Sequence, residues 1–185
     1  MYYQVITSEL ARIDSIINEF LILAKPHATK FQEKDLNKIL KETVDLLSAQ
    51  AVLHNVQFVT DMDSQLPLVF CEPNQLKKVF INIIKNAIEV MPMGGNITIT
   101  TKMLEGEQVQ ISIQDEGSGI SKEKIKKLGE PFFTTKDEGN GLGLMVSYRI
   151  INDHQGSITI ESEEGRGTTF YIQLPLDLKE KKETV

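Results

Sequence analysis

The chain has 185 residues, and 41% of them are hydrophobic, enough to bury the core of one ordinary domain and leave an appendage. Its net charge of −6 excludes the basic footprint that nucleic-acid-binding domains carry. The single cysteine, Cys71, excludes an internal disulfide and a multi-cysteine zinc site, and its apolar neighbours predict a buried, inert thiol. No run of about 18 apolar residues is present, so we expect no helix that spans a membrane.

The N-terminal segment, residues 3–25, is predicted to form one helix. Its apolar residues recur at alternating steps of four and three, the spacing of a coiled-coil or helical-bundle seam. The seam consists of Ile6, Leu10, Ile13, Ile17, Phe20 and Ala24. Lys25-Pro26 ends the helix. Because the sequence starts inside a helix whose seam needs a partner, we expect the chain to be a fragment of a longer protein.

The rest of the chain is predicted to alternate between helices and strands after a polar linker at residues 27–35. Helices are expected over residues 36–54, 73–91, about 121–127, and from Met145 to about His154. Strands are expected over residues 56–60, 68–71, 97–103, 108–114, 157–162 and 168–174, the last four as two hairpins. This order favours a two-layer α/β (α+β) sandwich with helices on a mixed, mostly antiparallel sheet. We therefore divide the chain into a bundle helix (1–26), the linker, a main domain (36–176) and a charged tail (177–185).

The most informative stretch is Gly139-Asn140-Gly141-Leu142-Gly143-Leu144. Alternate glycines let the backbone approach a ligand without obstruction by a Cβ atom. A helix that opens directly after them points free N–H groups and a partial positive charge at that ligand, which suits a phosphate. A tight turn without a ligand is the plain alternative, so the interpretation depends on what else the chain carries.

An acidic residue is predicted to lie in the core. Asp115 continues the apolar row of the strand at 108–114, so its carboxylate faces inward and needs hydrogen-bond donors. The turn at 117–119 can supply backbone N–H groups, and the amino group of a bound adenine is the functional alternative. Thr168 points inward by the alternation of its own strand and can pair with Asp115.

The helix at 73–91 carries a polar flank opposite its apolar face. Asn82 and Asn86 lie one turn apart on this flank, and asparagine is a mediocre helix former. Amide oxygens can hold Mg²⁺ while it carries phosphates, and Lys85 can neutralise phosphate charge. A solvated polar face is the alternative explanation.

In this order and spacing, these features resemble the ATP-binding catalytic domain of bacterial two-component sensor histidine kinases. That domain has the Bergerat ATP-binding fold, shared with DNA gyrase, MutL and the large heat-shock chaperone. The resemblance covers about residues 30–176. It rests on the N box at 82–87, the first glycine box at 115–119, the F box at 131–136 and the second glycine box at 139–144. The short F-box-to-glycine-box segment and Glu89 resemble the sporulation-kinase and nitrogen-regulator subgroup.

The resemblance implies ATP and Mg²⁺ as cofactors and a role for each motif. Asp115 would select adenine with help from Thr168, Asn86 would ligate Mg²⁺ with Asn82 close by, and residues 129–140 would form a lid over ATP. The residues implied to contact ATP are Asn82, Lys85, Asn86, Asp115, Gly117, Gly119, Ile120, Phe132, Lys136, Gly141, Leu142, Gly143, Leu144 and Thr168. One departure is Asn140, where the family often has threonine.

The resemblance also favours phosphotransfer over hydrolysis. ATP-hydrolysing members carry a glutamate general base one turn before the metal asparagine, where this chain has Asn82, an amide that cannot take a proton. The acceptor of such kinases is a histidine followed by an acidic residue, and none of His27, His54 and His154 has that context. Residues 3–25 resemble the second helix of the dimerisation hairpin, so the acceptor is expected on a bundle domain outside this chain.

The expected partners are therefore ATP, that bundle domain, a response regulator and a second copy bound through residues 3–25, without nucleic acid or membrane contact by this fragment. A cytoplasmic location follows from the resemblance, whether or not the parent protein is anchored in a membrane. Two alternatives stay open. One is a serine kinase of the anti-sigma type, which has the same boxes, and the other is a nucleotide-gated protein-binding module without transfer chemistry.

Overall fold

The structure, a computed structural model, describes residues 30–131, 133–134 and 141–178. Near the N-terminus it describes Ile6, Thr7, Leu10, Ile13, Ile17 and Leu21. The rest of the predicted N-terminal helix, and the tail beyond Leu178, lie outside the described residues. The division of the chain into a bundle helix, linker, main domain and tail therefore stays a prediction.

A five-stranded mixed sheet forms one layer of the main domain. Its strand order is β2 (Val56–Met62), β4 (Gly95–Leu104), β5 (Gln108–Asp115), β7 (Gly167–Pro175) and β6 (Ser157–Glu163). Only the β2–β4 pair is parallel, and the other three pairs are antiparallel. The predicted mostly antiparallel sheet is confirmed.

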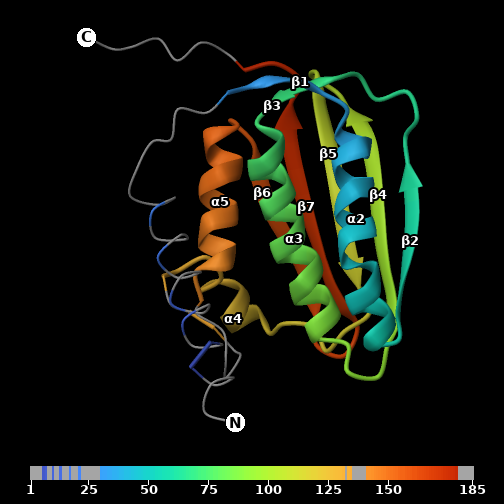
Figure 1. Cartoon of the computed structure of the whole chain (residues 1–185), viewed down its shortest axis with the longest axis vertical. Helices are drawn as coiled ribbons and strands as arrows, with labels where there is room; N and C mark the ends of the chain where they lie inside the picture. Colours follow the sequence, from blue (N-terminus) through green and yellow to red (C-terminus); the bar gives the residue numbers. More distant parts are fainter. Residues whose placement is uncertain are drawn as a thin grey trace.

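Helices cover one face of this sheet (Figure 1). They are α2 (Leu36–Leu53), α3 (Pro73–Glu89) and α5 (Gly143–Asp153), with the short α4 (Lys122–Ile125) before the glycine-rich loop. The predicted two-layer sandwich is therefore confirmed. Within the described part of the chain, no helix combines the length and the hydrophobicity that crossing a membrane requires.

The core lies between α3 and the central strands. Glu72 caps the start of α3 by accepting hydrogen bonds from the backbone N–H groups of Asn74 and Gln75, and Pro73 occupies a first-turn position that it tolerates. The α3 residues that face the sheet include Val79, Phe80, Ile83 and Ile84, all fully buried. Burying each such side chain stabilises the fold by about 1.5–3 kcal/mol. This packing fixes α3, and with it the N-box side chains on its opposite flank.

A short strand lies in the stretch expected to be a linker. β1 (Gln32–Lys34) pairs antiparallel with β3 (Val69–Cys71), and the Phe31 ring contacts the rings of Phe70 and His154 at centroid distances of 5.9 and 4.8 Å. The three polar residues of β1 show no alternation from which a strand could be predicted. The strand depends on its pairing with β3, which lies more than 30 residues later in the chain. Cys71 is fully buried as predicted, and burial raises its pKa to about 11.

Four of the predicted seam residues are described, together with one further apolar residue of the same segment, Leu21. Ile6, Leu10, Ile13, Ile17 and Leu21 are helical, and each is between 42% and 59% exposed. Apolar side chains this exposed at bundle spacing are typical of a helix that lacks its packing partner.

Candidate nucleotide site

Asp115, the last residue of β5, lies in the core at 3% exposure. Its Oδ1 accepts hydrogen bonds from the backbone N–H groups of Gly117, at 2.9 Å, and Thr168, at 3.2 Å. Burial raises the pKa of this carboxyl, and the two hydrogen bonds oppose that rise. No described residue donates to the other carboxylate oxygen. The backbone donor predicted in the turn at 117–119 is therefore present, and the second carboxylate oxygen of Asp115 remains able to accept a hydrogen bond.

Thr168 is buried as predicted, but its hydroxyl does not bond Asp115. The Thr168 backbone N–H makes that contact, because the two residues are paired across β5 and β7. The hydroxyl lies 2.9 Å from Oγ of Ser162, which accepts a hydrogen bond from the Ile120 backbone N–H and donates one to the Gly167 carbonyl. Ser162 thus joins the first glycine box to the β6–β7 hairpin. The sequence signal was its inward position after Ile158 and Ile160.

Two glycines near Asp115 permit an approach that no other residue could make. Gly119 has a φ of +68°, and a Cβ there would overlap the Glu163 carbonyl. Gly167 has a φ of +101°, and a Cβ there would overlap the carbonyl of Asp115 itself. Both positions need glycine for conformation and for space. The predicted glycine box therefore holds the loop after β5 tightly against the β6–β7 hairpin.

The N box and the start of α5 are joined by one polar side chain. The Asn82 amide donates to the Gly143 carbonyl at 3.0 Å and to Oγ of Ser147 at 3.4 Å. The buried Ser147 hydroxyl donates to the same Gly143 carbonyl at 2.9 Å. This contact explains why an asparagine stands inside α3. Sequence reasoning considered Asn82 as a ligand and missed its donor role, because the partner lies 61 residues away.

No side chain of the described residues caps the N-terminus of α5. Its N-cap residue, Leu142, is buried and makes no side-chain hydrogen bond to the helix. The first N–H groups of an α-helix have no partner within the helix, and they carry a partial positive charge. In an 11-residue helix directly after the second glycine box, this arrangement suits an anionic ligand.

The other predicted site residues divide into two groups. Lys85 is exposed and Asn86 half-buried on the flank of α3, while Gly141 and Leu144 lie on either side of the α5 start. Phe132 and Lys136, together with most of the predicted lid at 129–140, lie outside the described residues. Their roles stay predictions.

The described residues contain no group of three or more histidine, cysteine, aspartate or glutamate side chains that could hold a metal ion. The oxygen donors that the sequence predicts for a cation here are the side-chain amides of Asn82 and Asn86. Hard cations such as Mg²⁺ bind oxygen ligands, and Mg²⁺ commonly completes its shell with water and substrate phosphates, so a small number of protein oxygens fits it. Asn86 is the candidate ligand, with Asn82 as a second candidate through the oxygen of its amide.

Neither described histidine is placed as an acceptor. His54 is exposed, and its ring bonds the Gln50 carbonyl at the end of α2. His154 is buried, where its Nδ1 donates to the Ile150 carbonyl at 2.8 Å and its Nε2 accepts from the Glu72 N–H at 3.1 Å. Burial lowers its pKa, so the ring is held neutral. His27 lies outside the described residues.

Comparison with known proteins gives one family and many relatives. Residues 71–178 match the family described as "Histidine kinase-, DNA gyrase B-, and HSP90-like ATPase". The chain is 61% identical to "Sporulation kinase E" of Bacillus subtilis (strain 168) over 176 residues, which are 95% of this chain and 24% of that protein. It is 38% identical to "Signal transduction histidine-protein kinase AtoS" of Escherichia coli (strain K12), over 95% of this chain and 29% of that protein.

Solved structures show the same fold. The nucleotide-free catalytic domain of histidine kinase ThkA matches with a TM-score of 0.72 and 33% identity, over 80% of this chain and 97% of that one. Full-length ShkA, solved in complex with AMPPNP, matches with a TM-score of 0.86 and 22% identity, over 96% of this chain and 39% of that one. The chain thus covers nearly all of a catalytic domain but only about a quarter of the two curated relatives.

Proposed function

Because the chain belongs to the family of histidine kinase-, DNA gyrase B- and HSP90-like ATPases, we propose that it is the ATP-binding catalytic region of a sensor histidine kinase. It transfers the γ-phosphate of ATP to a histidine on a helical-bundle domain, from which the phosphoryl group passes to a response regulator. The bond between the γ-phosphorus and the bridging oxygen breaks, a phosphorus–nitrogen bond forms, and ADP leaves.

The observation that carries this proposal is the half-used carboxylate of Asp115. One oxygen is held by the backbone N–H groups of Gly117 and Thr168, so the side chain cannot rotate without losing both. The other oxygen accepts nothing from a described residue and is an acceptor for the amino group of adenine. A hydrogen bond to a charged group contributes about 1.5–3 kcal/mol. Asp115 therefore selects adenine, with Thr168 acting through its backbone N–H.

The phosphates are proposed to lie at the start of α5. The backbone N–H groups of Gly141, Gly143 and Leu144 lie there beside Leu142, and no side chain of the described residues caps the helix. Lys85 and Lys136 are proposed to neutralise phosphate charge, and Asn86 to ligate Mg²⁺. When bound, Mg²⁺ supplies charge neutralisation at the transferring phosphoryl group.

The hydrogen bonds of Asn82 favour phosphoryl transfer over hydrolysis of ATP. Its amide donates to Gly143 and Ser147, so this group positions the helix and cannot serve as a base for water. Phosphoryl transfer needs little proton chemistry from the protein and depends mainly on positioning and charge neutralisation. A histidine brought by the bundle domain supplies the nucleophile.

Residues 3–25 are proposed to form a dimer interface in the parent protein. The described seam residues, from Ile6 to Ile17, are exposed at the spacing of a helical bundle. A second copy, or the other helix of the hairpin, would cover them. Because ATP is the proposed donor, we expect this region to act in the cytoplasm.

The test is transfer of label from [γ-³²P]ATP with Mg²⁺ to a separately made bundle domain of the parent kinase. Acid-labile, alkali-stable label on the bundle domain is the expected result. A bundle domain with its acceptor histidine replaced by glutamine is the matched control and should stay unlabelled.

The other outcomes identify the alternatives. Acid-stable label on a serine of an added substrate would indicate a serine kinase of the anti-sigma type. ATP binding without any transfer, when the complete bundle is supplied, would leave a nucleotide-gated binding module.

A further inference from the structure

A small aromatic cluster holds the chain where it enters the domain. The Phe31 ring packs on the Phe70 ring at a centroid distance of 5.9 Å and on the His154 ring at 4.8 Å. Phe31 directly precedes β1, whereas Phe70 lies in β3 and His154 is the C-cap of α5. Figure 1 shows β1 and β3 at the same end of the molecule as the end of α5. We call these three residues the entry cluster.

The His154 ring is a rigid seat for Phe31. Its Nδ1 donates to the Ile150 carbonyl of α5, and its Nε2 accepts from the N–H of Glu72, the N-cap residue of α3. The ring therefore joins the end of α5 to the start of α3, and it cannot turn without breaking these bonds. A residue that packs on this ring is held by the two helices that carry the proposed phosphate and metal ligands.

β1 by itself contributes little to the docking of this segment. It has three residues, it pairs with β3 alone, and Gln32 and Glu33 are exposed. An isolated pair of short strands is marginal in water. Phe31 is the one apolar residue of the stretch 30–35, and it is half-buried. Loss of its ring contacts should therefore release β1 from β3.

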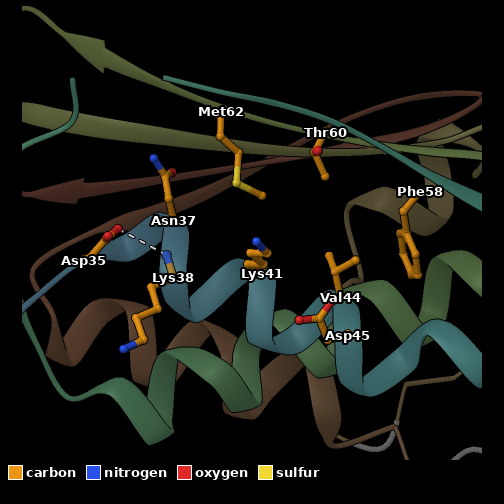
Figure 2. A pocket seen from close by; sticks show the side chains of 9 residues that line it. All are labelled: Asp35, Asn37, Lys38, Lys41, Val44, Asp45, Phe58, Thr60 and Met62. Carbon is orange, nitrogen blue, oxygen red and sulfur yellow. Dashed lines mark hydrogen bonds between the residues drawn. The ribbon is translucent and has the colours of Figure 1, made fainter. Parts of the chain in front are cut away.

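The start of α2, which follows β1, is held independently of it. The Asp35 carboxylate caps α2 by accepting from the Lys38 N–H at 3.1 Å, a bond drawn in Figure 2. Leu36 is 1% exposed, and the Asn37 amide donates to the Asp63 carbonyl at 2.8 Å. The chain is therefore fixed from Asp35 onward even when β1 leaves β3.

These two points of attachment give the entering chain two lengths. With Phe31 docked, the linker that the sequence predicts after Pro26 comprises residues 27–30. With Phe31 released, it comprises residues 27–34 and gains up to about 14 Å of reach. For a linker that already spans its two modules, their effective concentration falls roughly as the −3/2 power of its length. Doubling the number of residues therefore lowers the effective concentration about threefold.

We propose that Phe31 is a positioning residue, which docks on His154 and thereby sets how closely the bundle domain is tethered to the catalytic domain. This inference rests on the proposed kinase function. His154 ends α5, whereas the phosphates are proposed to lie at its start, so Phe31 acts through the tether and not on ATP. The docked state keeps the γ-phosphate at a high effective concentration near the histidine of the same protein. Transfer to a separately supplied bundle domain does not depend on it.

The first test is amide hydrogen exchange, measured by NMR on the 185-residue chain without nucleotide. Phe31→Ala removes the ring, and Phe31→Tyr keeps it. Phe58→Ala is the matched control, because it removes another half-buried phenylalanine ring, on β2. We expect the β1 amides to exchange at least tenfold faster in Phe31→Ala, with the α3 amides, which report global unfolding, within about threefold of wild type. Phe31→Tyr and Phe58→Ala should keep the wild-type exchange of β1.

The second test compares phosphoryl transfer in two arrangements, with [γ-³²P]ATP and Mg²⁺. In the parent kinase, Phe31→Ala should lower the rate at which the kinase labels its own bundle domain by about threefold. In the 185-residue chain, the same substitution should leave the labelling of a separately made bundle domain within about 1.5-fold of wild type. Phe31→Tyr should restore the wild-type rate in the parent kinase, because its ring can still pack on His154.

Three results would overturn the proposal. One is unchanged exchange of the β1 amides in Phe31→Ala, because the ring would then not hold the segment. Another is an equal fall of transfer in both arrangements, because Phe31 would then support the catalytic domain itself. The third is an equal or faster rate for Phe31→Ala in the parent kinase. Failure of the wild-type chain to label any bundle domain would instead contradict the kinase function, and the exchange measurement would still decide whether Phe31 holds β1.

Discussion

Asp115 and His154 are two buried titratable side chains, at 3% and 2% exposure, with opposite hydrogen-bonding states. Both ring nitrogens of His154 are bonded within the protein, whereas only one oxygen of Asp115 accepts hydrogen bonds from described residues. Burial disfavours the charged form of each, raising the pKa of Asp115 and lowering that of His154. Burial alone therefore does not separate the two residues, and the proposed nucleotide site depends on the unused acceptor oxygen of Asp115.

The largest expected effect is on ATP binding by Asp115→Asn. Asparagine can keep an oxygen as the acceptor for the Gly117 and Thr168 amides, and it places an NH₂ donor where adenine offers its own amino group. Loss of a charged hydrogen bond and the donor–donor contact predict a dissociation constant about 100- to 1000-fold higher. Isothermal titration calorimetry with ATP measures it.

Binding of GTP by the same variant is the matched control. Guanine presents a carbonyl oxygen where adenine presents the amino group, so Asp115→Asn should narrow the preference for ATP over GTP. The free energy of unfolding should stay equal or rise, because an amide is cheaper to bury than a carboxylate. An unchanged ATP affinity in a folded variant would contradict the role of Asp115.

His154→Ala should have the reverse profile. It leaves the partly buried Glu72 N–H and the buried Ile150 carbonyl without their ring partner, which is expected to lower the free energy of unfolding by about 2–3 kcal/mol. The ATP dissociation constant should stay within twofold. His54→Ala, at an exposed ring, is the control and should change stability by less than about 0.5 kcal/mol. A large loss of ATP affinity in His154→Ala would remove the contrast between the two residues.

Local periodicity was sufficient to predict most of the fold and part of this contrast. The alternation along β5 and β7 predicted that Asp115 and Thr168 face inward, and the structure confirms both positions. Periodicity describes which face a residue occupies, and it contains no information on which distant group will meet it.

Ser162 and the donor role of Asn82 were missed from the sequence, because both are defined by distant partners. Ser162 bonds Ile120 across 42 positions, and Asn82 bonds Gly143 across 61. The strand β1 depends in the same way on β3. The roles of Phe132 and Lys136 came from the family resemblance alone and stay predictions.

A smaller effect is expected for Asn82→Ala, which tests the phosphate end of the same site. The variant loses the amide bonds to Gly143 and Ser147, each of about 1 kcal/mol, while Ser147 still bonds the Gly143 carbonyl. We predict ATP binding about five- to tenfold weaker and adenosine binding unchanged, because the contacts of Asp115 are intact. Lys77→Ala, on the same helix and paired with Glu42, is the control. Equal losses for ATP and adenosine would show that Asn82 merely supports the fold.

The smallest predicted effect is the pH dependence of stability, and the two residues contribute with opposite sign. The pKa of His154 is lowered from 6.5 in the fold, so the unfolded chain takes up its proton first as the pH falls. Stability from the neutral ring is complete above about pH 6.5 and is lost as the pH falls through the folded-state pKa. The pKa of Asp115 is raised from 3.8, so its contribution is complete below that value and is lost as the pH rises through the folded-state pKa.

Urea unfolding at pH 7.5 and 5.5 separates these two contributions. Wild type should lose more stability than His154→Ala between the two values, because only wild type has the buried ring to protonate. Asp115→Asn retains the His154 ring. Within the part of this pH interval where that ring takes up its proton, the variant should therefore lose as much stability as wild type. If His154→Ala lost as much stability as wild type, the ring would not be held neutral by its surroundings. The hydrogen bonds at both nitrogens of His154 would then not account for a different behaviour from that of Asp115.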